Sequence, residues 1–237
     1  DNSGTDADVT IDGGTTALIL AASTIDGDLT VRNGNSITDS GTVTVGGNLA
    51  ATTDANNGVI NLGTLAVDGT VALTTNGSGN ATAVNDAGLD FAASTVGGNL
   101  AATATTGNMT DNGNVTVAGT SSFTTSANDA TIALNNTNAL TGAVTITTND
   151  GSGTDADVTI DNGTTALILA ASTIDGDLTV INGNSITDSG TVTVGGNLAA
   201  TTDANNGLIN LGTLAVDGTV ALTTNGSGNA TAVNDAG

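Results

Sequence analysis

The sequence predicts an all-β protein folded as a right-handed parallel β-helix, a β-solenoid with about 20–25 residues and three short strands per turn. Three observations lead to this prediction: a long internal duplication, a shorter period inside the duplicated unit, and a composition that disfavours helices. Periods of roughly 20–50 residues are typical of solenoids, because a single short turn cannot bury its apolar side chains without its neighbours.

The duplication covers most of the chain. Residues 3–88 return as residues 152–237 without a gap, so the sequence repeats itself after 149 residues. Three pairs of positions differ between the copies: Gly13 and Asn162, Arg32 and Ile181, and Val59 and Leu208. We therefore expect one continuous solenoid segment over residues 1–237, built from a 149-residue unit and without separate domains.

A shorter motif recurs inside the unit, a glycine that leads an alternating apolar stretch. Its six copies are GDLTV (27–31), GNLAATT (47–53), GTVALTT (69–75), GNLAATA (98–104), GTSSFTT (119–125) and GAVTITT (142–148). The next copy begins at Gly176 and starts the unit again. Six copies predict six turns of about 25 residues in each unit, and about ten turns in the whole chain.

Alternating apolar and polar residues place the strands. Such alternation over four to six positions indicates a strand with one buried face. The residues predicted to point inward include Val43 and Val45, Leu65 and Val67, Val71 and Leu73, and Ile132 and Leu134. DG, GG and NG pairs between the strands predict tight corners. Two longer stretches, 89–98 and 164–176, are interpreted as a longer first face or a bulging loop.

The composition favours strands and argues against several partners. The chain has no Glu, Gln, Lys, His, Cys, Pro, Trp or Tyr, so most strong helix formers are missing. A net charge of −22 with a single cation argues against binding to nucleic acid or to anionic lipid. No apolar run approaches the roughly 18 residues of a membrane span, so no membrane insertion is expected. Tandem β-sandwich domains are the alternative fold, disfavoured by the short period.

Three stretches resemble the repeats of a known class of protein: ITDSGTVTVGGNLAATT (37–53), SSFTTSANDATIALNNTNALTGAVTITT (121–148) and ASTIDGDLTVINGNSITDSG (171–190). They resemble the repeats of filamentous-haemagglutinin-like large bacterial exoproteins, adhesins exported by two-partner secretion or as autotransporters. The resemblance implies a β-helical shaft, an extracellular or bacterial cell-surface location, and roles in adhesion, aggregation or a biofilm matrix. It carries over no binding residue, because no functional motif of that family is matched.

The residue types present argue against catalysis. Ser and Thr are abundant, but there is no His, Lys or Cys to act as a base or thiol nucleophile. Paired aspartates could act as in glycosidases, and this is the enzyme alternative. An enzyme that cleaves acidic polysaccharides would need cations to hold its substrate, and this chain has one. We therefore expect no enzymatic activity, no catalytic residue and no organic cofactor.

Ca²⁺ is the candidate ligand that the sequence suggests most clearly. The segment NDGSGTDADVTID (149–161) brings together four oxygen-bearing side chains: Asp150, Ser152, Asp155 and Asp157. The segment has neither the EF-hand spacing nor a bidentate Glu. The alternative is a solvated acidic turn whose side chains bond to nearby backbone.

Threonine pairs suggest a second binding alternative. Pairs close four of the Gly-led segments: Thr52 and Thr53, Thr74 and Thr75, Thr124 and Thr125, and Thr147 and Thr148. Stacked on one face, they would form a flat ladder able to order water, so ice binding is an alternative function. Threonine is also simply favoured at exposed strand positions.

The expected function is structural, the shaft of a secreted or surface-attached fibre. We expect self-association end to end, or with further repeats of the same protein, and a host or neighbouring-cell surface as a further partner. Neither end of the sequence has a polar cap, so we expect a segment of a longer protein or of a filament that neighbours complete. A stalk that holds a distal tip and a self-assembling filament both remain open.

Overall fold

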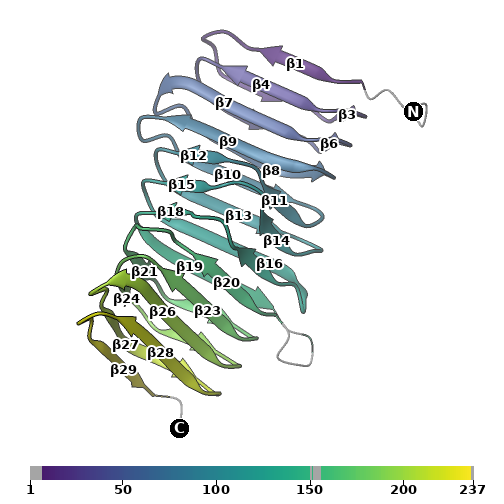
Figure 1. Cartoon of the computed structure of the whole chain (residues 1–237). Coiled ribbons are helices and arrows are strands. Elements are labelled where there is room, and N and C mark those ends of the chain that lie inside the picture. Colours follow the sequence, from purple (N-terminus) through teal and green to yellow (C-terminus); the bar gives the residue numbers. More distant parts are fainter. Residues whose placement is uncertain (1–6, 150, 152–155, 236–237) are drawn as a thin grey trace.

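A computed structural model of the chain describes residues 7–149, 151 and 156–235. Within these residues the chain forms strands and no helix, and the strands stack along one axis into an elongated rod (Figure 1). All of the pairings between strands are parallel, so the predicted all-β parallel solenoid is confirmed. Because the described residues form no helix, none of them provides a helical membrane span.

Two sheets form the walls of the rod. In the described residues sheet A has 14 strands: β1 (Val9–Asp12), β4 (Leu29–Asn33), β7 (Leu49–Asn56), β9 (Thr70–Asn76), β11 (Leu89–Phe91), β12 (Ser94–Val96), β14 (Met109–Asp111), β15 (Val115–Val117), β17 (Ile132–Leu134), β18 (Ala139–Leu140), β20 (Val158–Asp161), β23 (Leu178–Asn182), β26 (Leu198–Asn205) and β28 (Val220–Asn225).

The opposite wall is sheet B. In the same residues it has 15 strands: β2 (Leu18–Leu20), β3 (Ser23–Ile25), β5 (Ile37–Asp39), β6 (Val43–Val45), β8 (Ile60–Val67), β10 (Ala81–Asn85), β13 (Leu100–Ala104), β16 (Ser121–Asn128), β19 (Ala143–Asn149), β21 (Leu167–Leu169), β22 (Ser172–Ile174), β24 (Ile186–Asp188), β25 (Val192–Val194), β27 (Ile209–Val216) and β29 (Ala230–Asn234).

The register of the sheets gives the length of a turn. Val9 lies beside Leu29, and Leu29 lies beside Leu49, so each of these two turns takes 20 residues. Later turns are longer where corners widen, as between Ile132 and Val158. In the part of the chain that the structure describes, sheet A passes from β1 to its duplicate β20 in seven steps, through β4, β7, β9, β11, β14 and β17.

The unit therefore has seven turns of about 21 residues, and the prediction of six turns per unit was wrong. The two long stretches explain the difference. Residues 89–98 and 164–176 contain the strand pairs β11 and β12, and β21 and β22. Each pair occupies a wall of its own, so each stretch adds half a turn to the solenoid.

Each turn has one unbroken wall and one creased wall. On the unbroken wall the turn forms a single strand, whereas on the creased wall it forms two short strands or one strand with a bend. The unbroken strands lie in sheet A at β4, β7 and β9, move to sheet B from β10 to β19, and return to sheet A at β20. The unbroken wall thus changes sides twice, once at each long stretch.

The core is a thin layer of aliphatic side chains between the sheets. All eight residues named above as pointing inward are at most 2% exposed, which confirms the predicted facing. The two aromatic residues of the chain, Phe91 and Phe123, face each other across this layer. Their rings meet edge to face, with centroids 6.3 Å apart and an interplanar angle of 81°. This geometry is the one that aromatic pairs prefer.

Candidate functional site

The predicted calcium residues fall mainly outside the described structure. Asp150, Ser152 and Asp155 lie there, and Asp157 alone can be placed. Asp157 is exposed, and its Oδ1 accepts a hydrogen bond of 2.8 Å from the backbone N–H of Asp177, one turn further on. Among the residues that the structure describes, no group of three or more acidic side chains could hold a metal ion.

Asp157 belongs to a ladder of side chains that joins successive corners. In the first copy, Asp8 accepts from the N–H of Asp28 at 2.9 Å, and Asp28 accepts from the N–H of Asn48 at 2.7 Å. Each acceptor lies one turn earlier in the chain than its donor, so the ladder runs along the rod axis. The glycine before Asn48 is required, because a Cβ at Gly47 would collide with the Asp28 carboxylate and with the backbone of Gly27. This ladder was not predicted, although the recurring Gly-Asp and Gly-Asn dipeptides mark its positions in the sequence.

A second aspartate position holds the creased wall. Oδ2 of Asp39 accepts from the backbone N–H of Thr64 at 2.7 Å and from its hydroxyl at 2.8 Å, and Oδ1 accepts from the N–H of Gly63 at 3.1 Å. Asp188 repeats this arrangement with Thr213 in the second copy, at 2.7 and 2.9 Å. These carboxylates therefore bind backbone at the bend.

Buried side-chain amides complete the backbone hydrogen bonding at two places. At each of them a creased strand or strand pair is followed, in the same sheet, by an unbroken strand. Oδ1 of Asn162 accepts from the N–H of Leu140 at 2.7 Å, and its Nδ2 donates to the carbonyl of Leu140 at 3.2 Å. Asn85 does the same for Val67, at 2.8 and 2.9 Å. Each amide thus takes the place of a backbone partner, because the unbroken strand is too short to pair with the end of the creased one. Both side chains are at most 1% exposed.

Buried hydroxyls accept backbone hydrogen bonds at the other kind of junction, where an unbroken strand is followed in the same sheet by two short strands. Ser94 lies where unbroken β9 meets β11 and β12, and its Oγ accepts from the N–H of Leu73 at 3.1 Å. Ser172 accepts from the N–H of Ile146 at 3.0 Å where β19 meets β21 and β22. Nothing in the sequence assigned a role to these four junction residues, because each resembles the many other Asn and Ser residues beside strands; Asn162 stood out only as a position where the two copies differ.

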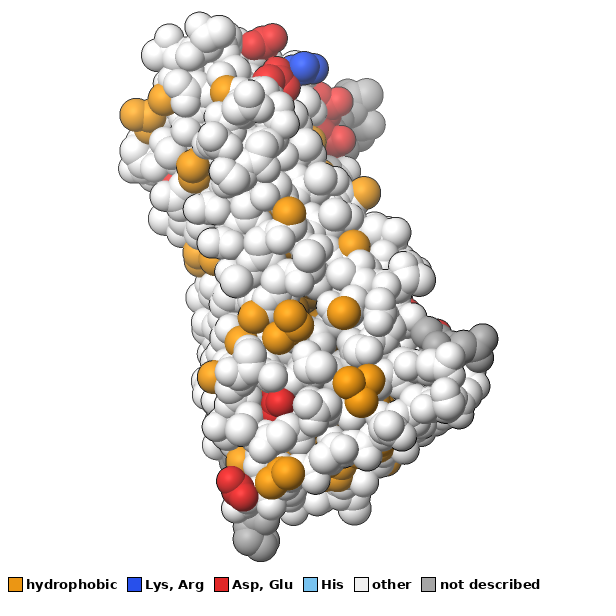
Figure 2. Space-filling view, turned by 90° about the vertical axis from the view of Figure 1, so that its left-hand side faces the viewer, with side chains coloured by type: hydrophobic (Ala, Val, Ile, Leu, Met, Phe, Trp, Pro, Cys, Tyr) orange, Lys and Arg blue, Asp and Glu red, His pale blue; other side chains and the backbone are white. Residues whose placement is uncertain are grey.

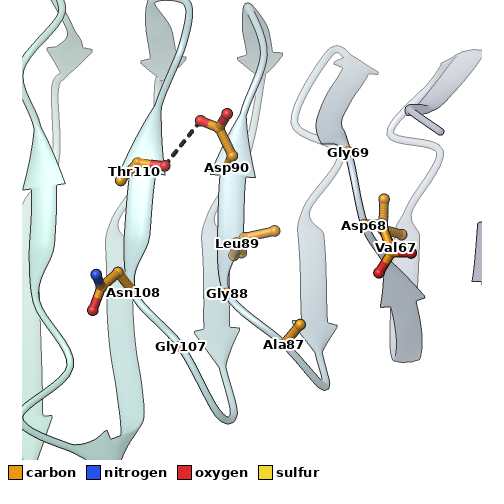
Figure 3. A pocket seen from close by; sticks show the side chains of 10 residues that line it. All are labelled: Val67, Asp68, Gly69, Ala87, Gly88, Leu89, Asp90, Gly107, Asn108 and Thr110. Atoms are coloured by element: carbon orange, nitrogen blue, oxygen red, sulfur yellow. Dashed lines mark hydrogen bonds between the residues drawn. The ribbon is translucent and has the colours of Figure 1, made fainter. Parts of the chain in front are cut away.

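An open hollow of about 400 Å³ lies beside the first junction (Figure 3). It is lined by residues of three successive corners: Val67, Asp68, Gly69, Ala87, Gly88, Leu89, Asp90, Gly107, Asn108 and Thr110. The Thr110 hydroxyl donates to Oδ1 of Asp90 at 3.0 Å, whereas Asp68 lies on the corner of a different turn. The lining offers carboxylates, an amide and a hydroxyl, and no cation, thiol or imidazole.

The threonine pairs do not form one ladder. Thr52 lies beside Thr74 in sheet A, and Thr124 lies beside Thr147 in sheet B, so the pairs divide between opposite walls. The second member of every pair is at most 5% exposed. These buried hydroxyls donate to carbonyls across the corner, as Thr75 does to Gly79 at 2.7 Å. The half-turn at residues 89–98 is the reason that the pairs change walls.

The single cation of the chain makes an exposed ion pair. Nε of Arg32 donates to Asp54 Oδ2 at 2.7 Å, and this hydrogen bond and the charge of Asp54 raise the pKa of Arg32. On the side of the molecule that Figure 2 shows, charged side chains gather toward the two ends, and the middle carries mostly uncharged ones. Ile181 replaces Arg32 in the second copy, so the turn does not require the pair.

Of the three comparisons with known proteins, one identifies a family and two find no match. The search of curated proteins and the search of solved structures found no match to the chain. A family model matches three stretches, residues 6–62, 78–147 and 155–211. The middle match nearly coincides with β10 to β19, the segment whose unbroken strands lie in sheet B. One family repeat thus corresponds to about half of the 149-residue unit, and the chain belongs to the family described as repeats of unknown function (DUF5649).

Proposed function

We propose that this chain is a shaft segment of a secreted or cell-surface bacterial adhesin or extracellular filament, and that it performs no catalysis. The observation that carries the proposal is the way the second copy stacks on the first. β20 continues sheet A from β17, with Val158 beside Ile132, and β21 continues sheet B from β19, with Leu169 beside Val144. Duplication of the sequence therefore lengthens the rod without a new kind of contact.

The geometry suits a mechanical role. Parallel backbone ladders run through successive turns in both sheets, so axial strain is shared among many hydrogen bonds. Among the described residues, one aliphatic cluster extends from Leu20 to Val216 and includes Ile146 and Val158 on the two sides of the junction between the copies. The aspartates at the corners keep such a rod soluble through its net charge.

Location and partners are part of the proposal. The resemblance of the repeats to those of large bacterial exoproteins favours export to the cell surface. Further repeats of the same protein, stacked end to end, are the partners that fit the two walls, because only strands of the same spacing continue both ladders. A stalk with a distal tip and a filament of repeats are two forms of this role.

Adding one unit tests the role as a shaft. A second copy of residues 89–237 appended after Gly237 should add seven turns, about 34 Å at roughly 4.8 Å per turn. Small-angle X-ray scattering and electron microscopy would measure the lengthened particle. Two separate short rods, or a particle that widens without lengthening, would overturn the proposal.

Location has its own test. Antibodies against the purified chain, applied to intact cells of the source organism, should label the surface, and protease added outside should remove the label. Labelling that appears only after lysis would contradict an extracellular shaft.

A further inference from the structure

Charge is distributed unequally between the two walls. In the part of the chain that the structure describes, strands of sheet A contain one Arg and six Asp residues: Asp12, Arg32, Asp54, Asp90, Asp111, Asp161 and Asp203. In the described residues, strands of sheet B contain two, Asp39 and Asp188, and both carboxylates bind backbone at the crease. Sheet B is therefore the less charged wall of a chain whose net charge is −22.

The strands in the middle of sheet B carry no charge. Between Asp39 and Asp188, no residue of β8, β10, β13, β16, β19, β21 or β22 is charged. Their outward side chains form two rows in register. We call them the neutral face: Asn61, Thr82, Ala101, Ser122 and Thr145 in one row, and Val84, Thr103, Thr124, Thr147 and Thr173 in the other.

We propose that the neutral face is a lateral interface for a second copy of this chain. Two copies can meet there without opposing carboxylates, whereas contact through sheet A would bring aspartates together. A cationic partner would be drawn to the corners and to sheet A, where the carboxylates lie. Two copies also share the same spacing between turns, so small side chains of one face can fit between rows of the other along the rod.

The interface of a single chain is small. Five layers at roughly 4.8 Å give a face about 24 Å long, so the contact falls below the roughly 1,200 Å² of stable protein interfaces. Weak association is expected for the chain alone. Longer rods, with several neutral faces each, should associate more strongly. Once one face has bound its partner, the next face on the same rod is already held close to its own partner.

The test compares two variants that add the same charge. Ala101→Asp with Thr147→Asp places two carboxylates on exposed positions of the neutral face, and Thr30→Asp with Thr116→Asp places two on exposed positions of sheet A. Circular dichroism would show that both variants fold. Sedimentation equilibrium of the full chain at about 0.15 M salt, up to millimolar concentration, would measure dimerisation.

We expect the unaltered chain and the sheet A variant to dimerise alike, and the neutral-face variant to dimerise at least about tenfold more weakly. Scattering from the dimer should show a wider particle of nearly unchanged length. Equal dimerisation of both variants, a dimer of doubled length, or a monomer at all concentrations would overturn the proposal. Ice shaping by a monomer would instead assign this face to ice. The shaft role does not depend on the result.

Discussion

At Asn162, a side chain occupies the place of a backbone partner. Its amide both accepts from and donates to Leu140, in the manner of an extended residue on a neighbouring strand. Leu140 is fully buried, so its N–H and C=O would otherwise lack partners in the core. Asn85 serves Val67 in the same way half a unit earlier. Residues of this kind make the change of walls possible, because an unpaired buried peptide group is costly.

Replacement of this amide should be expensive. We expect Asn162→Ala to lower the free energy of unfolding by about 2–4 kcal/mol, because it leaves the N–H and C=O of Leu140 without partners. Urea denaturation followed by circular dichroism would measure the change.

Asn182→Ala is the matched control for this prediction. Asn182 is equally buried, but its Oδ1 has no hydrogen-bond partner, and its Nδ2 donates to the carbonyl of Ser185. The control should therefore lose about 1 kcal/mol or less. Equal losses for the two variants would show that the pairing with Leu140 has no special weight.

The carboxylate of Asp157 also binds a backbone group, and no metal ion is needed to explain its position. Because Asp157 accepts from the N–H of Asp177, Asp157→Asn should keep this bond, and the loss of one like charge at the corner should not lower the melting temperature. Adding EDTA or millimolar Ca²⁺ should also leave the melting of the unaltered chain unchanged. A rise in melting temperature with Ca²⁺ that Asp157→Asn removes would instead support the calcium site.

At the scale of elements, the number of whole and half turns between two segments decides which wall each of them joins. The Gly-led segment after Gly69 forms β9 in sheet A, whereas the similar segment after Gly98 forms β13 in sheet B. Between them lie β10, β11 and β12, one and a half turns of chain. Whole turns keep a motif on its wall, and half turns move it to the other.

Deletions test this account directly. Removing residues 29–48 joins Asp28 to Leu49 and takes out one complete turn, because Leu29 and Leu49 are register partners. We expect this variant to keep its β circular dichroism and its cooperative unfolding. Removing residues 29–38 takes out about half a turn and places sheet A strands against sheet B, so large destabilisation is expected. Similar urea midpoints for the two deletions would contradict the register.

At the scale of the whole molecule, repulsion between like charges opposes the stacking of turns. The chain carries −22 with one exposed ion pair in its described part, and the aspartate ladders place carboxylates at successive corners. Salt should therefore stabilise the rod by screening this repulsion.

We expect the melting temperature to rise steadily between about 0.01 and 1 M NaCl, where the Debye length falls from roughly 30 to 3 Å. Choline chloride at the same ionic strength should give a similar rise and is the control for specific cation binding. A flat or falling profile would show that corner repulsion does not limit stability.

Sequence alone was sufficient for the local structure. Alternation at Val43 and Val45, or at Leu65 and Val67, determines which side chains point inward, because side chains alternate along any strand. The duplication determined that the chain is a stack of similar turns. Only the tertiary structure decided the number of turns, the burial of Thr75, and the roles of Asn85 and Asn162. A period of two residues distinguishes inside from outside but does not tell one wall from the other. That choice depends on pairing between residues 19 or more positions apart, and half a turn of extra chain changes the wall of every later strand.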